Sequence, residues 1–377
     1  MEQAQTGMFS FFTGAGFLDL GFEDAGFVSL AANEIDPDFA MVYRHSRNKL
    51  GKPMPEWGLN EESIAVYLED AERKKWLAEA LAKARKRFPW VGFVGGPPCP
   101  DFSVAGKQAG ADGRHGHLSQ IYMDAICQFR PDFFVFENVK GLLKTAKHRA
   151  FFDALVRQAR AAGYATDWRL LNALWYGVAQ DRERVIFIGV LQSRLKQDGR
   201  TGDGVLSGVP WMARTRYSPD TLKGIPWPGR ATFHEGGESQ MPAGIPEELT
   251  VEHWFRENDV ERHPNARDCF IPRAGLDKMR RFDEGDDSRK CYKRLHRWRY
   301  SPTAAYGNNE VHLHPYRARR LSVAETLAIQ SLPKEFELPS GVSLSAKFKT
   351  IGNGVPYLLA RGVAHTLLDF LGKEGLS

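Results

Sequence analysis

Short apolar runs alternate with longer amphipathic stretches at both ends of the chain. Six of these apolar runs predict strands of a buried sheet, and several of them are bounded by Gly, Pro or charged residues. They lie at residues 8–12, 27–32, 90–94, 132–136, 168–172 and 185–190. The stretches between most of them predict helices, at residues 41–47, 69–88, 118–129 and 150–162. This alternation is typical of an α/β fold with a largely parallel sheet.

The pattern changes in the middle of the chain. Residues 193–315 are rich in Gly, Pro, Trp and charge and have little periodicity. A chain of 377 residues is long enough for two domains. We therefore expect this segment to form a second, smaller and irregular domain.

Regular structure is expected again near the C-terminus. Ser322 and Glu325 have the spacing of a capping box and predict the start of a helix. We expect a turn at residues 350–356 and an apolar helix over residues 357–371. This tail has the composition of the N-terminal core, so we expect it to fold back onto that core.

Charge and cysteine spacing narrow the class of protein. The net charge of +5 is mild, but its sign suits a polyanionic partner. The four cysteines show no C-x-x-C or His-rich spacing, so we expect neither a zinc site nor a disulfide framework. The sequence shows no secretion signal and no apolar run long enough to span a bilayer. A cytoplasmic protein is therefore predicted.

The strongest candidate for chemistry is Cys99, which follows the strand at residues 90–94 within Gly-Gly-Pro-Pro-Cys-Pro. Open α/β sheets bind their ligands at the carboxyl ends of the strands. The three neighbouring prolines restrict the backbone around the thiol. A lone cysteine is more often a small buried apolar residue, but packing does not require three prolines and two glycines around one sulfur. The loop therefore favours a displayed nucleophile.

A glycine turn follows the first strand at residues 13–16. Its glycines allow a cofactor to approach the backbone at the start of a helix. The G-x-G-x-x-G fingerprint is absent, because Phe17 and then Gly21 follow. Glu34 stands at the tip of the second strand, where a carboxylate can accept hydrogen bonds from a ribose. These features predict a nucleoside-like ligand, although Glu34, and more so Asp36, could instead cap the next helix.

Charged residues also mark two later strands. Glu137 follows the strand at residues 132–136 and is the expected carboxyl partner of Cys99; a capping or turn role is the alternative. Arg182 and Arg184 are two residues apart at the entry to another strand, so they project to one face. Such a pair suits a phosphate or a polar base edge. On an edge strand, however, both arginines could be solvated charges.

Two segments suggest contact with a large substrate. Residues 106–116 are rich in Gly, Lys, Arg and His and predict a mobile loop that closes over a bound substrate. Residues 271–320 hold thirteen Lys and Arg against six Asp and Glu. Aromatic residues are interleaved with these charges at Tyr292, Trp298, Tyr300 and Tyr306. This composition fits a nucleic-acid-binding face, with a solvated charged surface as the alternative.

Taken in their order along the chain, the motifs resemble those of the cytosine-5 DNA methyltransferases. The matching segments are residues 12–16, 34, 96–99, 137–139, 180–184, 320–333 and 352–356. Each is weak alone, but the ordered set is highly specific. The resemblance implies a doubly wound, Rossmann-like methyltransferase core formed by residues 1–192 and 316–377. It also implies a target-recognition domain at residues 193–315.

The resemblance further implies the reaction. Such an enzyme transfers a methyl group from S-adenosylmethionine to carbon 5 of a flipped-out cytosine in duplex DNA, leaves S-adenosylhomocysteine, and needs no metal. By resemblance, Cys99 is the nucleophile that adds to carbon 6 of the ring. A protonated Glu137 donates to ring nitrogen 3, and Arg182 and Arg184 lie near the site. The residues implied for cofactor binding are Phe12, Thr13, Gly14, Ala15, Gly16, Phe17, Glu34, Ile35, Pro97, Asn353 and Gly354.

Three positions depart from the family pattern. Pro100 stands where glutamine is common, and Phe17 replaces a common glycine and should reshape the wall of the cofactor pocket. The third motif has its best counterpart at residues 62–64, which leaves the contact to the adenine amino group unassigned.

The expected protein is a monomer, with a cognate restriction endonuclease as a functional partner. The alternatives are a relative that acts on RNA and a catalytically silent DNA-binding module.

Overall fold

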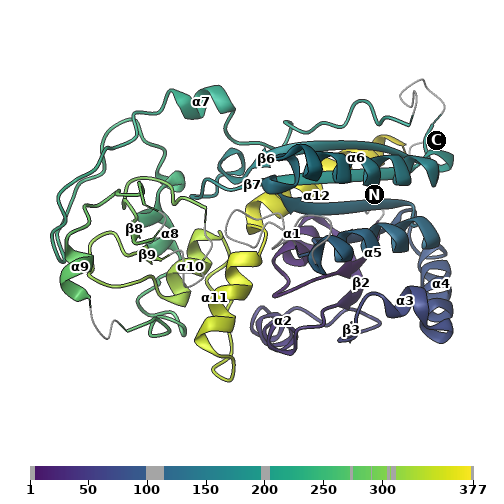
Figure 1. The fold of residues 1–377 in the computed structure, drawn as a ribbon, viewed down its shortest axis with the longest axis horizontal. Helices are drawn as coiled ribbons and strands as arrows, with labels where there is room; N and C mark the ends of the chain where they lie inside the picture. The colour runs from purple at the N-terminus through teal and green to yellow at the C-terminus, as the bar shows by residue number, and fades with distance from the viewer. Residues whose placement is uncertain are drawn as a thin grey trace.

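The centre of the protein is a seven-stranded sheet with strand order β3-β2-β1-β4-β5-β7-β6 (Figure 1). The computed structural model describes residues 5–98, 114–196, 204–271, 275–289, 291–303, 306 and 311–374. The strands are β1 (Thr6–Phe11), β2 (Phe27–Asn33), β3 (Leu59–Asn60), β4 (Val91–Gly95), β5 (Phe133–Val139), β6 (Tyr164–Asn172) and β7 (Glu183–Leu191). Strands β1 to β5 pair in parallel, and β7 runs antiparallel to both of its neighbours. The predicted α/β class is confirmed.

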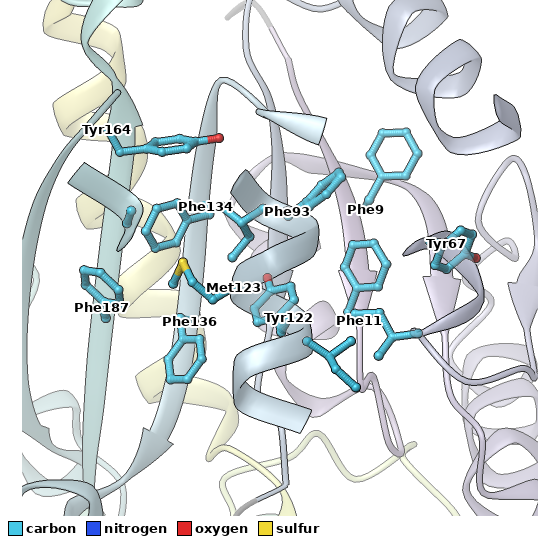
Figure 2. Packing of buried hydrophobic residues seen from close by; sticks show 14 of the residues in the cluster. Phe9, Phe11, Tyr67, Phe93, Tyr122, Met123, Phe134, Phe136, Tyr164 and Phe187 are labelled. Atoms are coloured by element: carbon cyan, nitrogen blue, oxygen red, sulfur yellow. The ribbon is translucent and has the colours of Figure 1, made fainter. Parts of the chain in front are cut away.

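Helices cover both faces of the sheet. They include α1 (Phe17–Ala25), α2 (Pro37–Lys49), α3 (Val66–Glu69), α4 (Ala71–Arg85), α5 (Arg114–Phe129), α6 (Ala146–Ala161) and α12 (Tyr357–Glu374). Side chains alternate between the faces along each strand, so Phe134 and Phe136 belong to the core that includes residues of α4, α5 and α6. They lie near Tyr122 and Met123 of α5 (Figure 2). Phe133 and Val135 pack with α1 and α12 on the other face. The sheet is therefore buried between two helical layers, as its apolar strands require.

The register of the sheet aligns the last residues of β1, β2 and β4 with Phe136, which lies three residues before the end of β5. Phe11 pairs with Asn33 on one side and with Gly95 on the other, and Gly95 pairs with Phe136. The residues that follow these four positions therefore meet at one edge. This edge carries the glycine turn, Glu34, the start of the Cys99 loop and Glu137.

The C-terminal helix α12 packs along α1, as the sequence predicts. Gly21 of α1 makes this close approach possible. A Cβ at Gly21 would lie 2.6 Å from the Ala360 Cβ and 2.7 Å from the Arg361 nitrogen. Because one of these atoms belongs to the backbone, the contact cannot be relieved by a side-chain rotation. The two ends of the chain thus share one core.

We expect Gly21→Ala to destabilise the fold. Overpacking costs typically about 1–3 kcal/mol. This exceeds the roughly 0.5–1 kcal/mol that alanine gains over glycine within a helix. Urea unfolding measures the difference. Gly372→Ala in α12 is the matched control, because a Cβ there meets no atom within 4 Å; we expect no loss of stability in that variant, and an equally stable Gly21→Ala protein contradicts the prediction.

The segment from residue 193 to residue 315 contains short elements, which lie to the left of the sheet in Figure 1. They are α7 (Pro219–Lys223), α8 (Val251–Glu257), α9 (Leu276–Arg280), β8 (Lys293–Arg294) and β9 (His312–Leu313). The chain then forms α10 (Val323–Ile329) and α11 (Leu344–Asn353). The 3-10 helices are η2 (Lys140–Leu143), η3 (Ala173–Tyr176), η4 (Gln192–Arg194) and η5 (Glu247–Leu249). A third core joins α1 and α2 to α8, α10 and α11.

Two predictions about local structure need correction. The turn expected at residues 350–356 is wrong for its first half, because α11 continues to Asn353. Ile351 and Phe348 anchor α11 in the third core, and this packing outweighs the weak helix propensity of Gly352. The loop expected at residues 106–116 falls mostly on residues outside the described part, but residues 114–116 belong to α5. The predicted capping box of Ser322 and Glu325 is confirmed.

Candidate active site

Glu137 is a buried carboxyl at the functional edge of the sheet. Only 7% of its surface is exposed. Its Oε1 lies 2.8 Å from Arg184 Nε. Arg184 pairs in register with Val139, two residues beyond Glu137, so the ion pair is a diagonal contact between β5 and β7. Burial raises the pKa of Glu137, and the charges of Arg184 and Arg182 oppose that shift. The site thus favours a protonated carboxyl more than water does.

The chain that leads to Cys99 passes directly over this carboxyl. A Cβ at Gly96 would lie 2.7 Å from Glu137 Oε2, so a side chain at this position would force the carboxyl to shift. Asn138 Nδ2 donates to the Pro97 carbonyl over 3.4 Å and links the same loop to β5. Cys99 itself lies outside the described residues. The described chain reaches Pro98, one residue before Cys99.

Arg182 and Arg184 are not solvated charges on an edge strand. Strand β7 lies between β5 and β6, and both guanidinium groups are buried. They nevertheless have different partners. Arg182 Nη2 donates to the carbonyls of Gly352 and Gly354 at 2.7 and 3.0 Å, whereas Arg184 pairs with Glu137. Arg182 therefore ties β7 to the end of α11, and Arg184 acts on the carboxyl.

The glycine turn after β1 has the predicted tight geometry. Phe12, Gly14 and Gly16 have φ values of 55°, 57° and 82°. The Thr13 nitrogen donates to the Asn33 carbonyl at 3.1 Å, which fixes the turn to the end of β2. A Cβ at Gly14 would meet no atom within 4 Å, so this glycine borders open space. A positive φ is unusual for an aromatic residue and marks Phe12 as a strained position.

Glu34 accepts hydrogen bonds both from the glycine turn and from Asp36, the residue before the next helix. Its Oε2 accepts from the Gly14 nitrogen at 2.8 Å and its Oε1 from the Asp36 nitrogen at 2.9 Å. Asp36 takes the capping role, because its side chain accepts from the Asp38 nitrogen at the start of α2. Burial raises the pKa of Glu34. The next residue, Ile35, is an apolar side chain with 61% of its surface exposed.

Phe17 and Gly354 meet at the junction between α1 and the C-terminal segment. A Cβ at Gly354 would lie 2.2 Å from the Phe17 ring, so glycine is needed there. The Phe17 ring is buried, and its centroid lies 5.1 Å from that of Phe336. Ala15 belongs to the same core, whereas Asn353 is exposed at the end of α11. The Phe17 side chain is thus part of the interface that holds the C-terminal segment.

Sequence reasoning missed two buried groups behind this edge. Asp19 accepts hydrogen bonds from three hydroxyl groups beneath the glycine turn. Gln330 Nε2 donates to the backbone carbonyl of Ile351 at 2.8 Å, and the backbone carbonyl of Gln330 accepts from the Tyr357 nitrogen. The available signal for Asp19 was a charged residue within the apolar sequence Phe-Leu-Asp-Leu-Gly-Phe. For Gln330 no local pattern marks its partners.

In the described ranges, no helix is long and apolar enough to cross a membrane. Among the same residues, no group of three or more His, Cys, Asp or Glu is arranged to hold a metal ion.

The doubly wound sheet with helices on both faces defines a protein with a Rossmann-like methyltransferase fold. A model of the C-5 cytosine-specific DNA methylase family matches residues 7–369. The chain therefore belongs to this family and is a DNA (cytosine-5) methyltransferase.

Known proteins resemble the chain over nearly its whole length. The type II methyltransferase M.NmeDI of Neisseria meningitidis serogroup C is 54% identical over 370 residues, which cover 98% of this chain and 85% of that protein. The type II methyltransferase M.FnuDI of Fusobacterium nucleatum is 28% identical and covers 96% of this chain and 95% of its own. A crystal structure of a candidate DNA modification methyltransferase encoded within an E. coli prophage has a TM-score of 0.59 at 22% identity, with 97% and 99% of the two chains covered.

Proposed function

We propose that the protein methylates carbon 5 of a flipped-out cytosine in duplex DNA through a covalent bond between Cys99 Sγ and carbon 6 of the ring. The observation that carries the proposal is the buried Glu137, whose pKa is raised by burial and which adjoins Gly96 at the start of the Cys99 loop. A thiol nucleophile and a protonated carboxyl acid are the two groups that this chemistry requires.

Each side chain has a defined task in the proposed reaction. Carbon 5 of cytosine is a poor nucleophile, and addition of the Cys99 thiolate to carbon 6 makes it enamine-like. Glu137 donates its proton to ring nitrogen 3, where the electron density from that addition accumulates. Arg184 holds the carboxyl of Glu137 in place through the 2.8 Å contact between Arg184 Nε and Glu137 Oε1. After carbon 5 has taken up the methyl group, a base removes the carbon 5 proton and the bond between Cys99 Sγ and carbon 6 breaks, so that Cys99 leaves as a thiolate. Ring nitrogen 3 returns its proton to Glu137, which restores the ring.

We propose S-adenosylmethionine as the methyl donor, which supplies an electrophilic methyl group when bound. The glycine turn fits such a ligand, because Gly14 borders open space. Glu34 uses one acceptor position of each oxygen within the protein and keeps others for ribose hydroxyls. The exposed Ile35 provides an apolar surface for a base. The full set of cofactor-binding residues proposed above on the basis of the family motifs remains part of this proposal.

DNA binding is proposed for the segment at residues 193–315, with residues 1–192 and 316–377 as the catalytic domain. The basic and aromatic composition of residues 271–320 needs a narrower interpretation. Trp298 and Tyr306 are buried, and so are several cations, so these side chains build the segment itself. Among the described residues of this range, Lys278, Arg280, Arg281 and Arg289 are exposed cations that fit phosphate contacts. The target cytosine must leave the helix to reach a thiol.

A restriction endonuclease with the same recognition sequence is the proposed functional partner, and a monomer is the proposed active form. The first of these proposals is supported by relatives that are type II methyltransferases. Its consequence is testable in cells. DNA from a host that expresses the protein should resist cleavage at a specific sequence that contains the methylated cytosine.

We expect the purified protein to methylate duplex DNA with tritium-labelled S-adenosylmethionine. We expect no labelling when the substrate is a tRNA. Bisulfite sequencing of plasmid DNA from an expressing host should then show 5-methylcytosine in one sequence context. Transfer to RNA alone contradicts the proposal and favours an RNA-directed relative. Duplex DNA containing 5-fluorocytosine separates an enzyme from a silent DNA-binding module, because only a thiol that attacks carbon 6 forms a covalent complex with it.

A further inference from the structure

Asp19 is a fully buried carboxyl beneath the glycine turn. It stands in the first turn of α1 and has no exposed surface. Its Oδ1 accepts from Ser10 Oγ at 2.6 Å, and its Oδ2 accepts from Tyr43 OH at 3.2 Å and from Thr13 Oγ1. These three hydroxyl groups come from β1, the turn and α2. The Asp19 carboxyl therefore links β1, the glycine turn and α2 to one another.

Two of these bonds lie on either side of a strained residue. Ser10 precedes Phe12 by two positions, Thr13 follows it, and Phe12 has a φ of 55°. A non-glycine residue keeps this conformation only where its surroundings over-determine it. The bonds from Asp19 to both flanking hydroxyl groups supply that constraint, together with the bond from the Thr13 nitrogen to β2.

Tyr43 extends the constraint to the other end of the turn. A Cβ at Gly16 would lie 2.8 Å from the Tyr43 ring, so the left-handed Gly16 rests against that ring. The guanidinium of Arg47 lies 5.2 Å from the ring centroid of Tyr43, and Arg47 Nη1 pairs with Glu23 Oε1 at 2.9 Å. Asp19 is thus the point at which the end of β1, the turn and the buried face of α2 are held together.

We propose that Asp19 is a positioning residue for the cofactor: it holds Phe12 and the turn at residues 13–16 in the conformation that binds S-adenosylmethionine. The inference rests on the proposed function. Because Asp19 is fully buried, it acts through Thr13 and Phe12 and does not touch the ligand. Burial raises the pKa of Asp19, and the hydrogen bonds from Ser10 and Thr13 oppose this shift. The hydroxyl groups that Asp19 holds in position therefore also stabilise its ionised form.

Asp19→Asn tests this role with little change in size. The new amide replaces one acceptor by two N–H donors that face hydroxyl donors. We expect the Kd for S-adenosylhomocysteine, measured by calorimetry, and the KM for S-adenosylmethionine to rise about tenfold, equivalent to about 1.4 kcal/mol. We expect kcat at saturating cofactor to stay within about threefold of the wild-type value and the KM for DNA to be unchanged. Asp24→Asn, an exposed carboxyl on the same helix, is the matched control and should leave all four values unchanged.

A second variant guards against loss of folding. Ser10→Ala removes one donor to Asp19 and is expected to weaken cofactor binding in the same direction by a smaller factor. The double variant should lose less than the sum of the two single losses, because both changes break one network. Equal losses in kcat and in both KM values, together with a lower Tm, overturn the inference in favour of a purely structural role.

The test also separates this inference from the proposed function. A wild-type protein that binds no S-adenosylhomocysteine overturns the proposed function and the inference with it. Wild-type binding combined with unchanged affinity in Asp19→Asn overturns the inference alone.

Discussion

Replacement of Cys99 by alanine is expected to reduce methyl transfer to below about one thousandth of the wild-type rate, since the loss of a covalent nucleophile removes the step on which the others depend. Without a thiolate at carbon 6, carbon 5 keeps its aromatic character and does not attack the methyl group. Tritium transfer from S-adenosylmethionine to duplex DNA at saturating substrates measures the loss. Binding of S-adenosylhomocysteine should be retained, because the glycine turn and Glu34 are untouched.

Cys127→Ala is the matched control for this experiment. Cys127 is half-buried on α5, and burial raises its pKa to about 11, so its thiol stays protonated at neutral pH. We expect full activity in this variant and a covalent complex with duplex DNA containing 5-fluorocytosine. The Cys99→Ala protein should bind that DNA without forming the covalent bond. Normal methylation by Cys99→Ala refutes the assignment of the nucleophile.

The sheet could be predicted from the sequence because its signals are local. Short runs of branched and aromatic residues between Gly, Pro and charged residues predicted six of the strands of the sheet. Strand β5 ends three residues later, and β6 begins four residues earlier, than predicted. In a parallel sheet, the residue after each strand lies at a common edge. Glu34 follows β2 as this rule requires, whereas Glu137 lies within β5 but beside the end of β4, because Gly95 pairs with Phe136.

The contacts across the chain could not be predicted in the same way. Arg182 donates to carbonyl groups that are 170 and 172 residues away. No periodicity within a short window reports such a partner. The sequence favoured a turn at residues 350–356 because glycine is a poor helix former, but burial of α11 in the third core decides its conformation.

Burial in the irregular segment was the least predictable feature. Arg294 is fully buried and donates to the carbonyls of Phe282, Met279 and His314. Arg297 forms a buried ion pair with Glu284. Basic composition alone cannot distinguish these internal cations from exposed ones that can contact phosphate. A segment with few regular elements needs such bonds to satisfy its backbone carbonyl groups, and this need consumes part of its positive charge.

The two buried acids at the functional edge illustrate how environment separates chemical roles. Burial raises the pKa of both Asp19 and Glu137. Asp19 is surrounded by hydroxyl donors that belong to the protein, so its acceptor positions are occupied within the fold. Glu137 has an arginine on one oxygen and the glycine at position 96 beside the other. The second oxygen is therefore the one that suits exchange of a proton with a substrate.

Glu137→Gln is expected to lower kcat by about 10²–10⁴-fold, the range typical for loss of a general acid. The glutamine amide can donate a hydrogen bond to ring nitrogen 3, but it cannot transfer a proton there. The affinity for S-adenosylhomocysteine should change little, because Glu137 does not belong to the glycine turn. Single-turnover methylation and calorimetry measure the two quantities separately. An equal loss in rate and in cofactor affinity removes Glu137 from the chemistry.

The substitution needs a control for folding, because it changes the buried contact between Arg184 and the carboxyl of Glu137. Loss of one member of a buried pair can cost about 3–5 kcal/mol. The thermal unfolding of the variant should therefore be recorded with and without S-adenosylhomocysteine. A folded variant that still gains stability from the ligand, but transfers methyl groups slowly, identifies a chemical defect.

The pH dependence gives the sharpest test of the proton on Glu137. Only the protonated carboxyl donates to the ring, and burial moves its pKa above the ordinary value of about 4.3. The activity that depends on this proton should therefore be present below the raised pKa and should fall as the pH rises through it. In the same window the folded state binds more protons than the unfolded state, so the free energy of unfolding should also fall with rising pH. The decline in rate should vanish in Glu137→Gln, whose amide does not titrate, and the decline in stability should become smaller, because burial also raises the pKa of Asp19 and of Glu34. A variant that keeps the wild-type decline in rate shows that another group supplies the proton.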